Sequence, residues 1–174
     1  MKTANLKLYS QYLDFTNKER QKHGCGIASL AMLMDYINHL SHTNKNIPSL
    51  DKLYQVGINR RAYIKGVGWR HSGLVGLAKI YGFKKSQAYD LSRFSDVEAL
   101  RILKQKLKQG PVLASIYSKY KTAGNGHLIG LLSVTKQEVV VLDPDSKTKQ
   151  QVLRHLPVAK FIRAWKKRFI AIRL

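Results

Sequence analysis

The chain is poor in cysteine, proline, acidic residues and long apolar runs, and each shortage excludes something. Cys25 is the only cysteine, so no intramolecular disulfide and no cysteine-based zinc cluster can form. The four prolines lie between periodic segments, and no Ser/Gly/Pro-rich linker is present. The longest apolar runs, Ile27 to Met34 and Leu128 to Val134, are far shorter than the ~20 residues of a membrane-spanning helix. The sequence therefore predicts no membrane span.

Acidic residues are also scarce, because 10 Asp and Glu stand against 31 Lys and Arg, giving a formal charge of +21. The excess runs along the whole chain, so a basic tail is excluded and a general positive field is expected, one that attracts anionic polymers. No nucleic-acid-binding motif is present, and lysine outnumbers arginine about two to one, which suits diffuse surface charge. Anionic cell-envelope polymers are therefore the favoured polyanionic partner, and nucleic acid is the less favoured one.

The length and the apolar content favour a single folded domain over residues 1–174. The chain has 174 residues, of which 44% are hydrophobic, enough to fill a core without a disulfide or a metal. The start, Met1 to Asn5, has no apolar signal core. That leaves both a cytoplasmic protein and an exported mature domain open.

Hydrophobic periodicity predicts helices in the first part of the chain and mostly strands after Gly110-Pro111. The stretch from Gly26 to Leu40 is apolar on nearly all sides, which predicts a buried central helix. Ser95 to Glu98 has the pattern of a capping box. The expected helices are Gly26 to Leu40, Leu50 to Val56, Ser72 to Tyr81, Ser95 to Leu107 and Pro157 to Trp165. The expected strands are Val112 to Tyr117, His127 to Val134, Glu138 to Asp143, Gln150 to Leu153 and Arg168 to Ile172.

This order of elements is typical of an α+β fold, in which helices are followed by an antiparallel sheet. No glycine-rich phosphate loop follows a predicted strand, so a doubly wound nucleotide-binding fold is not expected. No cofactor is expected either. His23, His39 and His42 have no carboxylate at ligand spacing, and we expect no metal site.

Cys25 is predicted at the N-terminus of the buried helix, between Gly24 and Gly26. A thiol attacks as the thiolate, and the partial positive charge of a helix N-terminus lowers the pKa of a cysteine there. A lone cysteine is otherwise a small buried apolar residue. A nucleophilic role therefore needs a base nearby.

The best-placed base is His127, which follows the turn Gly124-Asn125-Gly126 and is expected to be exposed at a sheet edge. Asp143 ends the next strand, so both side chains are predicted at the same end of neighbouring antiparallel strands. The carboxylate would then orient the imidazole ring. The competing interpretations are a surface histidine and an ordinary Asp-Pro turn, and His71 is the reserve base.

The residues resemble a known family at several points. The string Gly24 to Met32, then Gly126 to Ile129, then Leu142 to Pro144 resembles the bacterial double-glycine leader peptidase family and its stand-alone relatives, with Gly68-Trp69 and Gly110 to Val112 in the same order. The resemblance implies a papain-like cysteine peptidase fold. It also implies that Cys25 is the nucleophile, His127 the base and Asp143 its partner, acting on a peptide or protein substrate through an acyl-enzyme thioester.

The family's oxyanion hole combines the cysteine backbone N–H with a glutamine upstream of it, and here two glutamines compete. Gln11 lies in a segment that resembles the opening motif of the stand-alone relatives, whereas Gln21 is only four residues before Cys25. We favour Gln11, because its longer loop has the reach to return beside the thiol. Two other functions stay open: a cell-wall amidase or endopeptidase with the same triad, and a basic module that binds peptide or nucleic acid without catalysis.

Overall fold

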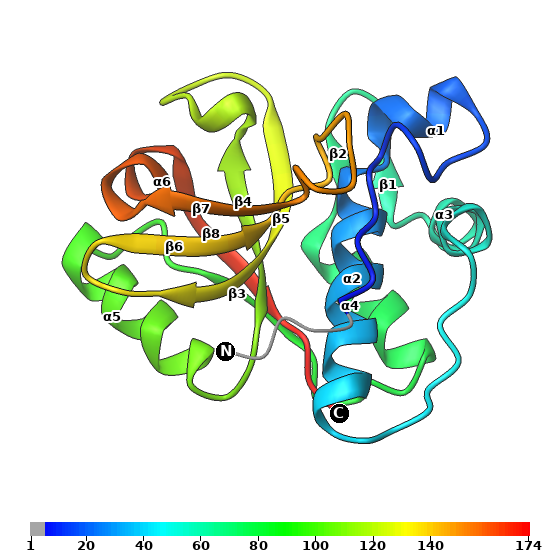
Figure 1. The fold of residues 1–174 in the computed structure, drawn as a ribbon, viewed down its shortest axis with the longest axis horizontal. Helices are drawn as coiled ribbons and strands as arrows, with labels where there is room; N and C mark the ends of the chain where they lie inside the picture. Colours follow the sequence, from blue (N-terminus) through cyan, green and yellow to red (C-terminus); the bar gives the residue numbers. More distant parts are fainter. Residues whose placement is uncertain (1–5) are drawn as a thin grey trace.

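The computed structural model describes residues 6–174, and it consists of a helical half and a sheet half that lie side by side (Figure 1). The start of the chain, where the sequence lacks an apolar signal core, lies outside the described residues. Within residues 6–174, no helix combines the length and the apolarity needed to cross a membrane.

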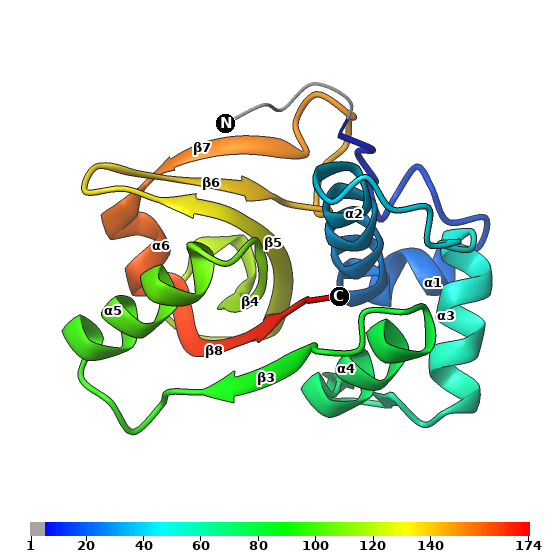
Figure 2. The ribbon, with the colours of Figure 1, turned by 90° about the horizontal axis from the view of Figure 1, so that it is seen from below.

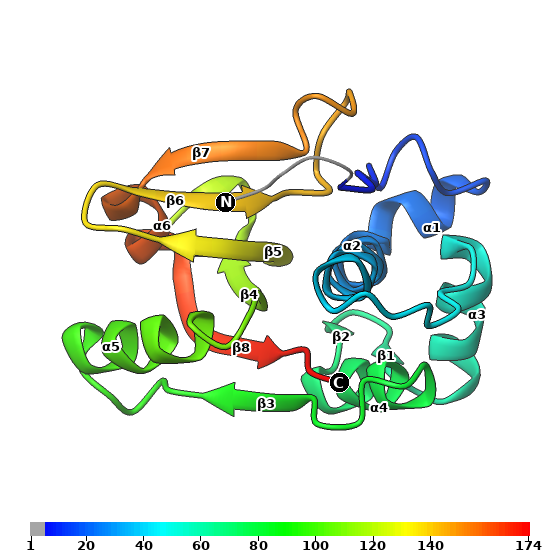
Figure 3. The same ribbon diagram turned by 60° about the horizontal axis from the view of Figure 1, so that its bottom comes forward.

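The helical half is built around the buried helix that the sequence predicts. This helix, α2, has eleven buried residues, and it runs between the sheet and α3 (Figures 2 and 3). Ser49 caps the N-terminus of α3 through its side chain, as its position before an apolar stripe suggests. The elements of this half are α1 (Lys18–His23), α2 (Cys25–Leu40), α3 (Leu50–Asn59), the hairpin β1 (Tyr63–Ile64) and β2 (Gly68–Trp69), and α4 (His71–Ile80).

The sheet half contains six strands in the order β3-β8-β4-β5-β6-β7, and every neighbouring pair is antiparallel. Two helices accompany the sheet on the side away from α2 (Figure 2). The elements are β3 (Gln87–Asp90), α5 (Asp96–Leu107), β4 (Val112–Tyr117), the 3-10 turn η1 (Ser118–Tyr120), β5 (Gly126–Val134), β6 (Glu138–Leu142), β7 (Leu153–Pro157), α6 (Val158–Ala164) and β8 (Trp165–Ala171).

The predicted α+β class is confirmed, and the differences concern short elements. The strand expected over Gln150 to Leu153 begins only at Leu153, after a turn. Strand β3 was not predicted, because three of its four residues are exposed and it shows no apolar alternation. Its place in the sheet comes instead from pairing with β8, far along the chain. The helix α1 and the hairpin β1–β2 were also missed, because they are too short to show a period.

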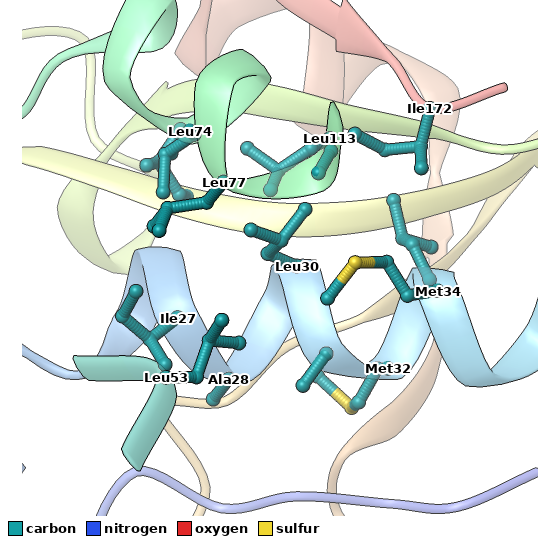
Figure 4. Packing of buried hydrophobic residues seen from close by; sticks show 14 of the residues in the cluster. Ile27, Ala28, Leu30, Met32, Met34, Leu53, Leu74, Leu77, Leu113 and Ile172 are labelled. Atoms are coloured by element: carbon teal, nitrogen blue, oxygen red, sulfur yellow. The ribbon is translucent and has the colours of Figure 1, made fainter. Parts of the chain in front are cut away.

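Two apolar clusters fill the molecule, one on each face of the sheet. The first joins α2, α3 and α4 to the sheet; in Figure 4, Leu30 and Met34 of α2 lie toward Leu77, Leu113 and Ile172. The second lies between the opposite face and the helices α5 and α6. α2 packs directly on β5, and Ser29, near the start of the helix, donates a hydrogen bond to the carbonyl oxygen of Leu128, near the start of that strand. The fold therefore brings the segments of Cys25 and His127 together.

Candidate active site

Cys25 is the first residue of α2, as predicted, and tight packing fixes its backbone. A Cβ atom added to Gly26 would lie 2.8 Å from Cδ1 of Trp69, so the residue after the cysteine has room for hydrogen only. The indole nitrogen of Trp69 donates a hydrogen bond of 2.6 Å to the carbonyl oxygen of His23. Trp69 is thus a buried core residue that packs against both sides of the cysteine segment.

The first turn of α2 is available to a negative charge at Cys25. No side chain caps this helix, so its first backbone N–H groups are not occupied by a capping oxygen. The backbone N–H groups of Gly26 and Leu128 lower the pKa of the Cys25 thiol. A helix N-terminus and two N–H donors favour the thiolate over the thiol.

His127 and Asp143 lie side by side, at the beginning of β5 and just beyond the end of β6. The distance between Nε2 of His127 and Oδ1 of Asp143 is 2.7 Å, and both side chains are buried. His127 also lies close enough to Cys25 for the two side chains to shift each other's pKa. Since Nε2 is engaged by the carboxylate, Nδ1 is the ring nitrogen that remains for the thiol. The predicted meeting of these two side chains at one end of antiparallel strands is confirmed in the structure.

The expectation that His127 would be exposed at a sheet edge is wrong. The residue is only 6% exposed, and β5 is an interior strand between β4 and β6. The turn before it suggested an exposed position, but the helical half covers the beginning of β5. A covered imidazole interacts more strongly with charged neighbours than an exposed one, because water screens less in the interior.

The three groups shift one another's pKa values. Burial raises the pKa of the Cys25 thiol, but the hydrogen bond and charge of His127 outweigh it, so the pKa lies below its ordinary value. Burial lowers the pKa of His127, but bonds to Asp143 and Cys25 raise it to about 10. Burial likewise opposes the charge of Asp143, and His127 and Arg154 nevertheless hold its pKa below the ordinary value. Each shift favours the charged form of its group: the thiolate of Cys25, the imidazolium of His127 and the carboxylate of Asp143.

Asp143 has three further partners that sequence reasoning missed. The hydroxyl of Tyr120 donates to Oδ2 at 2.9 Å, and Nη1 of Arg154 lies 3.1 Å from the same oxygen. The backbone N–H of Asp145 donates to Oδ1 at 3.0 Å. Neither Tyr120 nor Arg154 belongs to a motif, so nothing in their local sequence could have singled them out.

The two candidate glutamines lie next to each other, and they are used differently. The side-chain nitrogen of Gln11 donates to the carbonyl oxygen of Gln21 at 3.0 Å, and its buried Oε1 has no hydrogen-bond partner within residues 6–174. The backbone N–H of Gln11 donates to the carbonyl oxygen of Pro144, which follows Asp143. The side chain of Gln21 instead donates to the carbonyl oxygen of Phe15. Gln11 is therefore bound to the loop that carries Asp143, and Gln21 faces the N-terminal loop.

Tyr12 is a further residue near the thiol that the sequence did not indicate. Its hydroxyl donates to Oδ1 of Asp145 at 2.6 Å. Burial, Asp145, Asp143 and Cys25 raise the pKa of Tyr12 to about 12, so the phenol keeps its proton. The aromatic ring of Tyr12 is half-exposed and lies beside the site.

The reserve base, His71, lies apart from this group. Its charged neighbours are Arg168, Asp90 and Lys166, and burial and the two cations hold its pKa below the ordinary value. The structure therefore does not bring His71 to Cys25. In the part of the chain that the structure describes, no three His, Cys, Asp or Glu side chains gather as a metal site would require.

A family model for the Peptidase C39 like family matches residues 3–169. The chain belongs to this family. The resemblance noted on sequence motifs is therefore confirmed over nearly the whole chain. A comparison with curated protein sequences finds no match.

Solved structures of C39 peptidases share the fold. A C39-like peptidase from Bacillus anthracis has a TM-score of 0.64 at 19% identity, covering 95% of this chain and 93% of that chain. The peptidase domain of Streptococcus ComA, a bi-functional ABC transporter, has a TM-score of 0.56 at 17% identity, covering 86% and 90%. A double glycine motif protease from an AMS/PCAT transporter, in complex with the leader peptide, has a TM-score of 0.53 at 21% identity, covering 84% and 81%. The family and the fold of this chain are thus those of peptidases.

Proposed function

We propose that this C39-like protein is a cysteine peptidase that hydrolyses peptide bonds with Cys25 as nucleophile, His127 as general base and acid, and Asp143 as the group that orients the imidazole. The observation that carries the proposal is the buried chain of contacts from Asp143 through His127 to Cys25, at the N-terminus of α2. A nucleophile, a base and an orienting carboxylate in contact are the minimum set for covalent acyl transfer.

The reaction proceeds in two halves. In the first, the sulfur atom of Cys25 attacks the peptide carbonyl carbon, and the C=O π electrons move to oxygen. The C–N bond then breaks as they return, and Nδ1 of His127 gives its proton to the departing amine. In the second half, His127 accepts a proton from water, whose oxygen atom attacks the thioester carbon. The C–S bond then breaks, releasing the acid and restoring the ion pair.

The negative oxygen of each tetrahedral intermediate needs hydrogen-bond donors. The backbone N–H of Cys25 at the uncapped start of α2 would supply one. Gln11 would supply the second through its side-chain amide. Its support is its buried position and its backbone bond to Pro144, which place it on the loop of the triad carboxylate. Gln21 is the alternative donor, and in this structure the side-chain amide of each glutamine donates to a backbone carbonyl group, that of Gln11 to Gln21 and that of Gln21 to Phe15.

The substrate class is a peptide or protein. One structural neighbour holds the leader peptide in its complex, and the common fold makes a peptide chain the first ligand to test here. The sequence of the substrate does not follow from the fold, because one fold supports many specificities. A library of peptides is therefore the appropriate screen.

The decisive experiment measures the reactivity of the single cysteine. Iodoacetamide is added to the folded protein from pH 4 to 9, and intact mass reports alkylation, which can only be at Cys25. We expect rapid alkylation already well below pH 7, and an acid limb that moves toward the free-thiol value of about 8.5 in His127→Ala. His71→Ala is the matched control and should leave the profile unchanged. A thiol that titrates near 8.5 in both the wild type and His127→Ala would disprove the proposed function.

A second function is favoured by the charge. The same residues could cleave cell-wall peptides, with the charge of +21 concentrating the enzyme on anionic envelope polymers. Sedimentation with purified cell walls at increasing salt tests this, because electrostatic attraction is screened at high ionic strength. Strong, salt-sensitive binding and release of wall peptides would favour a cell-wall enzyme. An unreactive thiol together with binding to a polyanion would instead favour a module without catalysis.

A further inference from the structure

The Asp143 carboxylate has donors on both oxygen atoms, and they come from different parts of the chain. Oδ1 faces His127 and the backbone N–H of Asp145, whereas Oδ2 faces the hydroxyl of Tyr120 and the guanidinium of Arg154. The carboxyl group is 2% exposed, so these protein groups replace the water that would otherwise solvate it.

Tyr120 reaches the carboxylate from an unusual backbone conformation. It lies in η1, in the segment between β4 and β5, and both Lys119 and Tyr120 have a positive φ, 56° and 55°. Such conformations are rare for residues other than glycine, and they persist only where the surroundings enforce them. Here the phenol is bonded to Asp143, and the ammonium group of Lys160 lies 5.5 Å from the centre of the ring.

Arg154, the second side chain at Oδ2 of Asp143, is also held by several hydrogen bonds. It comes from β7, and its Nη2 atom donates to the carbonyl oxygen of Asp145 at 2.8 Å and to the hydroxyl of Ser146 at 2.6 Å. Its Nε atom donates to the carbonyl oxygen of Gln151 at 2.8 Å. These hydrogen bonds to the β6–β7 loop fix the guanidinium group independently of its contact with Asp143. In Figure 1, this loop and the segment between β4 and β5 both lie at the end of the sheet where β5 begins.

We propose that Tyr120 and Arg154 are positioning residues of the active site: together they fix the Asp143 carboxylate so that Oδ1 stays on Nε2 of His127 and Nδ1 stays directed to Cys25. Without donors on Oδ2, the carboxylate can rotate about its terminal bond and loosen its hold on the ring. Arg154 also balances the negative charge of Asp143, which otherwise opposes a thiolate nearby. Loss of either residue should therefore act in the same direction, because each loss raises the pH at which the thiolate forms.

The test uses Tyr120→Phe, which removes only the hydroxyl, and Arg154→Gln, which removes the charge. We expect the acid limb of Cys25 alkylation to move upward by about half to one pH unit in each variant, so that the rate below the limb falls about three- to tenfold. The matched controls are Tyr117→Phe, whose ring faces Lys166, and Arg163→Gln, on an exposed part of α6. Both controls should keep the wild-type profile.

This inference rests on the proposed function, and the outcomes separate the two. If the wild type shows a low acid limb that depends on His127 but Tyr120→Phe keeps it unchanged, the positioning role is disproved and the peptidase proposal stands. If the wild type itself titrates like a free thiol, the proposed function fails first, and the positioning role fails with it. A thermal unfolding midpoint measured beside each profile identifies a merely structural role, which lowers the midpoint without moving the limb. Because Tyr120→Phe changes one hydroxyl group, it decides the question even if Arg154→Gln does not fold.

Discussion

The side-chain hydroxyl of Ser29 donates a buried hydrogen bond of 2.9 Å to the carbonyl oxygen of Leu128. Ser29 lies one helical turn after Cys25, and Leu128 directly follows His127. This bond therefore joins the helix that begins at Cys25 to the strand that carries His127, beside the apolar cluster that joins the two halves. It links the two halves of the molecule one residue away from His127.

Replacing Ser29 by alanine should destabilise the protein and loosen this link. The lost hydrogen bond leaves a buried carbonyl oxygen with one partner fewer, which costs about 1–2 kcal/mol. Urea unfolding monitored by fluorescence measures the change in the free energy of unfolding. Ser72→Ala, on an exposed position of α4, is the control and should change stability by less than about 0.5 kcal/mol. Equal stabilities for Ser29→Ala and Ser72→Ala would show that the link contributes nothing.

Gly26→Ala should destabilise the protein although it adds only one methyl group, because that group has no space. The new Cβ atom would lie 2.8 Å from Cδ1 of Trp69 and 3.0 Å from Cδ1 of Leu128. We expect a loss of about 1–3 kcal/mol from overpacking, and slower alkylation of the neighbouring Cys25. Gly76→Ala is the control, since no atom lies within 4 Å of its added Cβ, and it should be neutral or stabilising by up to about 1 kcal/mol. A Gly26→Ala protein as stable and reactive as the wild type would contradict the packing argument.

The pH dependence of stability should reveal the ion pair. The pKa of His127 is raised from 6.5 to about 10, and that of Cys25 is lowered from 9.0. With the ion pair of the proposed mechanism, the folded protein holds one proton between about pH 6.5 and 9, on the imidazole, and the unfolded protein also holds one, on the thiol. The two proton counts are equal, so this pair contributes no slope in that window. Below this window, the free energy of unfolding decreases as the pH falls toward the lowered pKa of Cys25. Above the window, it decreases as the pH rises and His127 loses its proton.

Cys25→Ala should remove the pH range over which the pair leaves the stability unchanged. In the variant, the unfolded state releases the His127 proton near pH 6.5, and in the folded state Asp143 alone, without Cys25, raises the pKa of His127. Stability should therefore decline as the pH rises from about 6.5 until His127 deprotonates, and over that range the wild type should become more stable relative to the variant by up to about 1.4 kcal/mol per pH unit. Chemical denaturation at half-unit steps of pH measures this difference, in which groups shared by both proteins cancel. Parallel profiles would mean that Cys25 and His127 do not share a proton as described.

Gln11→Ala and Gln21→Ala should separate the two candidates for the oxyanion hole. Loss of one oxyanion donor typically lowers kcat by a factor of about 10²–10³, whereas alkylation by iodoacetamide forms no oxyanion. We therefore expect Gln11→Ala to lose peptide hydrolysis and to keep the wild-type alkylation profile. Gln21→Ala should keep both. The roles are reversed if Gln21→Ala alone abolishes hydrolysis of a peptide obtained from the library.

Local patterns were sufficient for the larger elements. The apolar residues of α2, the capping box at Ser95 and the turn before β5 each produce a signal within a few residues, and the structure confirms all three elements. The same patterns placed Cys25 at a helix N-terminus and placed Asp143 level with His127. Strand β3 had no such signal, because its partner β8 lies about 80 residues away in the chain.

The sequence by itself determined the α+β class, the buried central helix and the three residue types of the proposed triad, because these depend on periodicity, turns and order along the chain. Only the tertiary structure decided that His127 is buried, that Gln11 is joined to the Asp143 loop, and that Tyr120 and Arg154 hold the carboxylate. The physical reason is the separation of the interacting residues along the chain. A hydrogen bond between residues 23 positions apart depends on how a strand, a turn and a loop fold over one another, and no local pattern of residues records that distance.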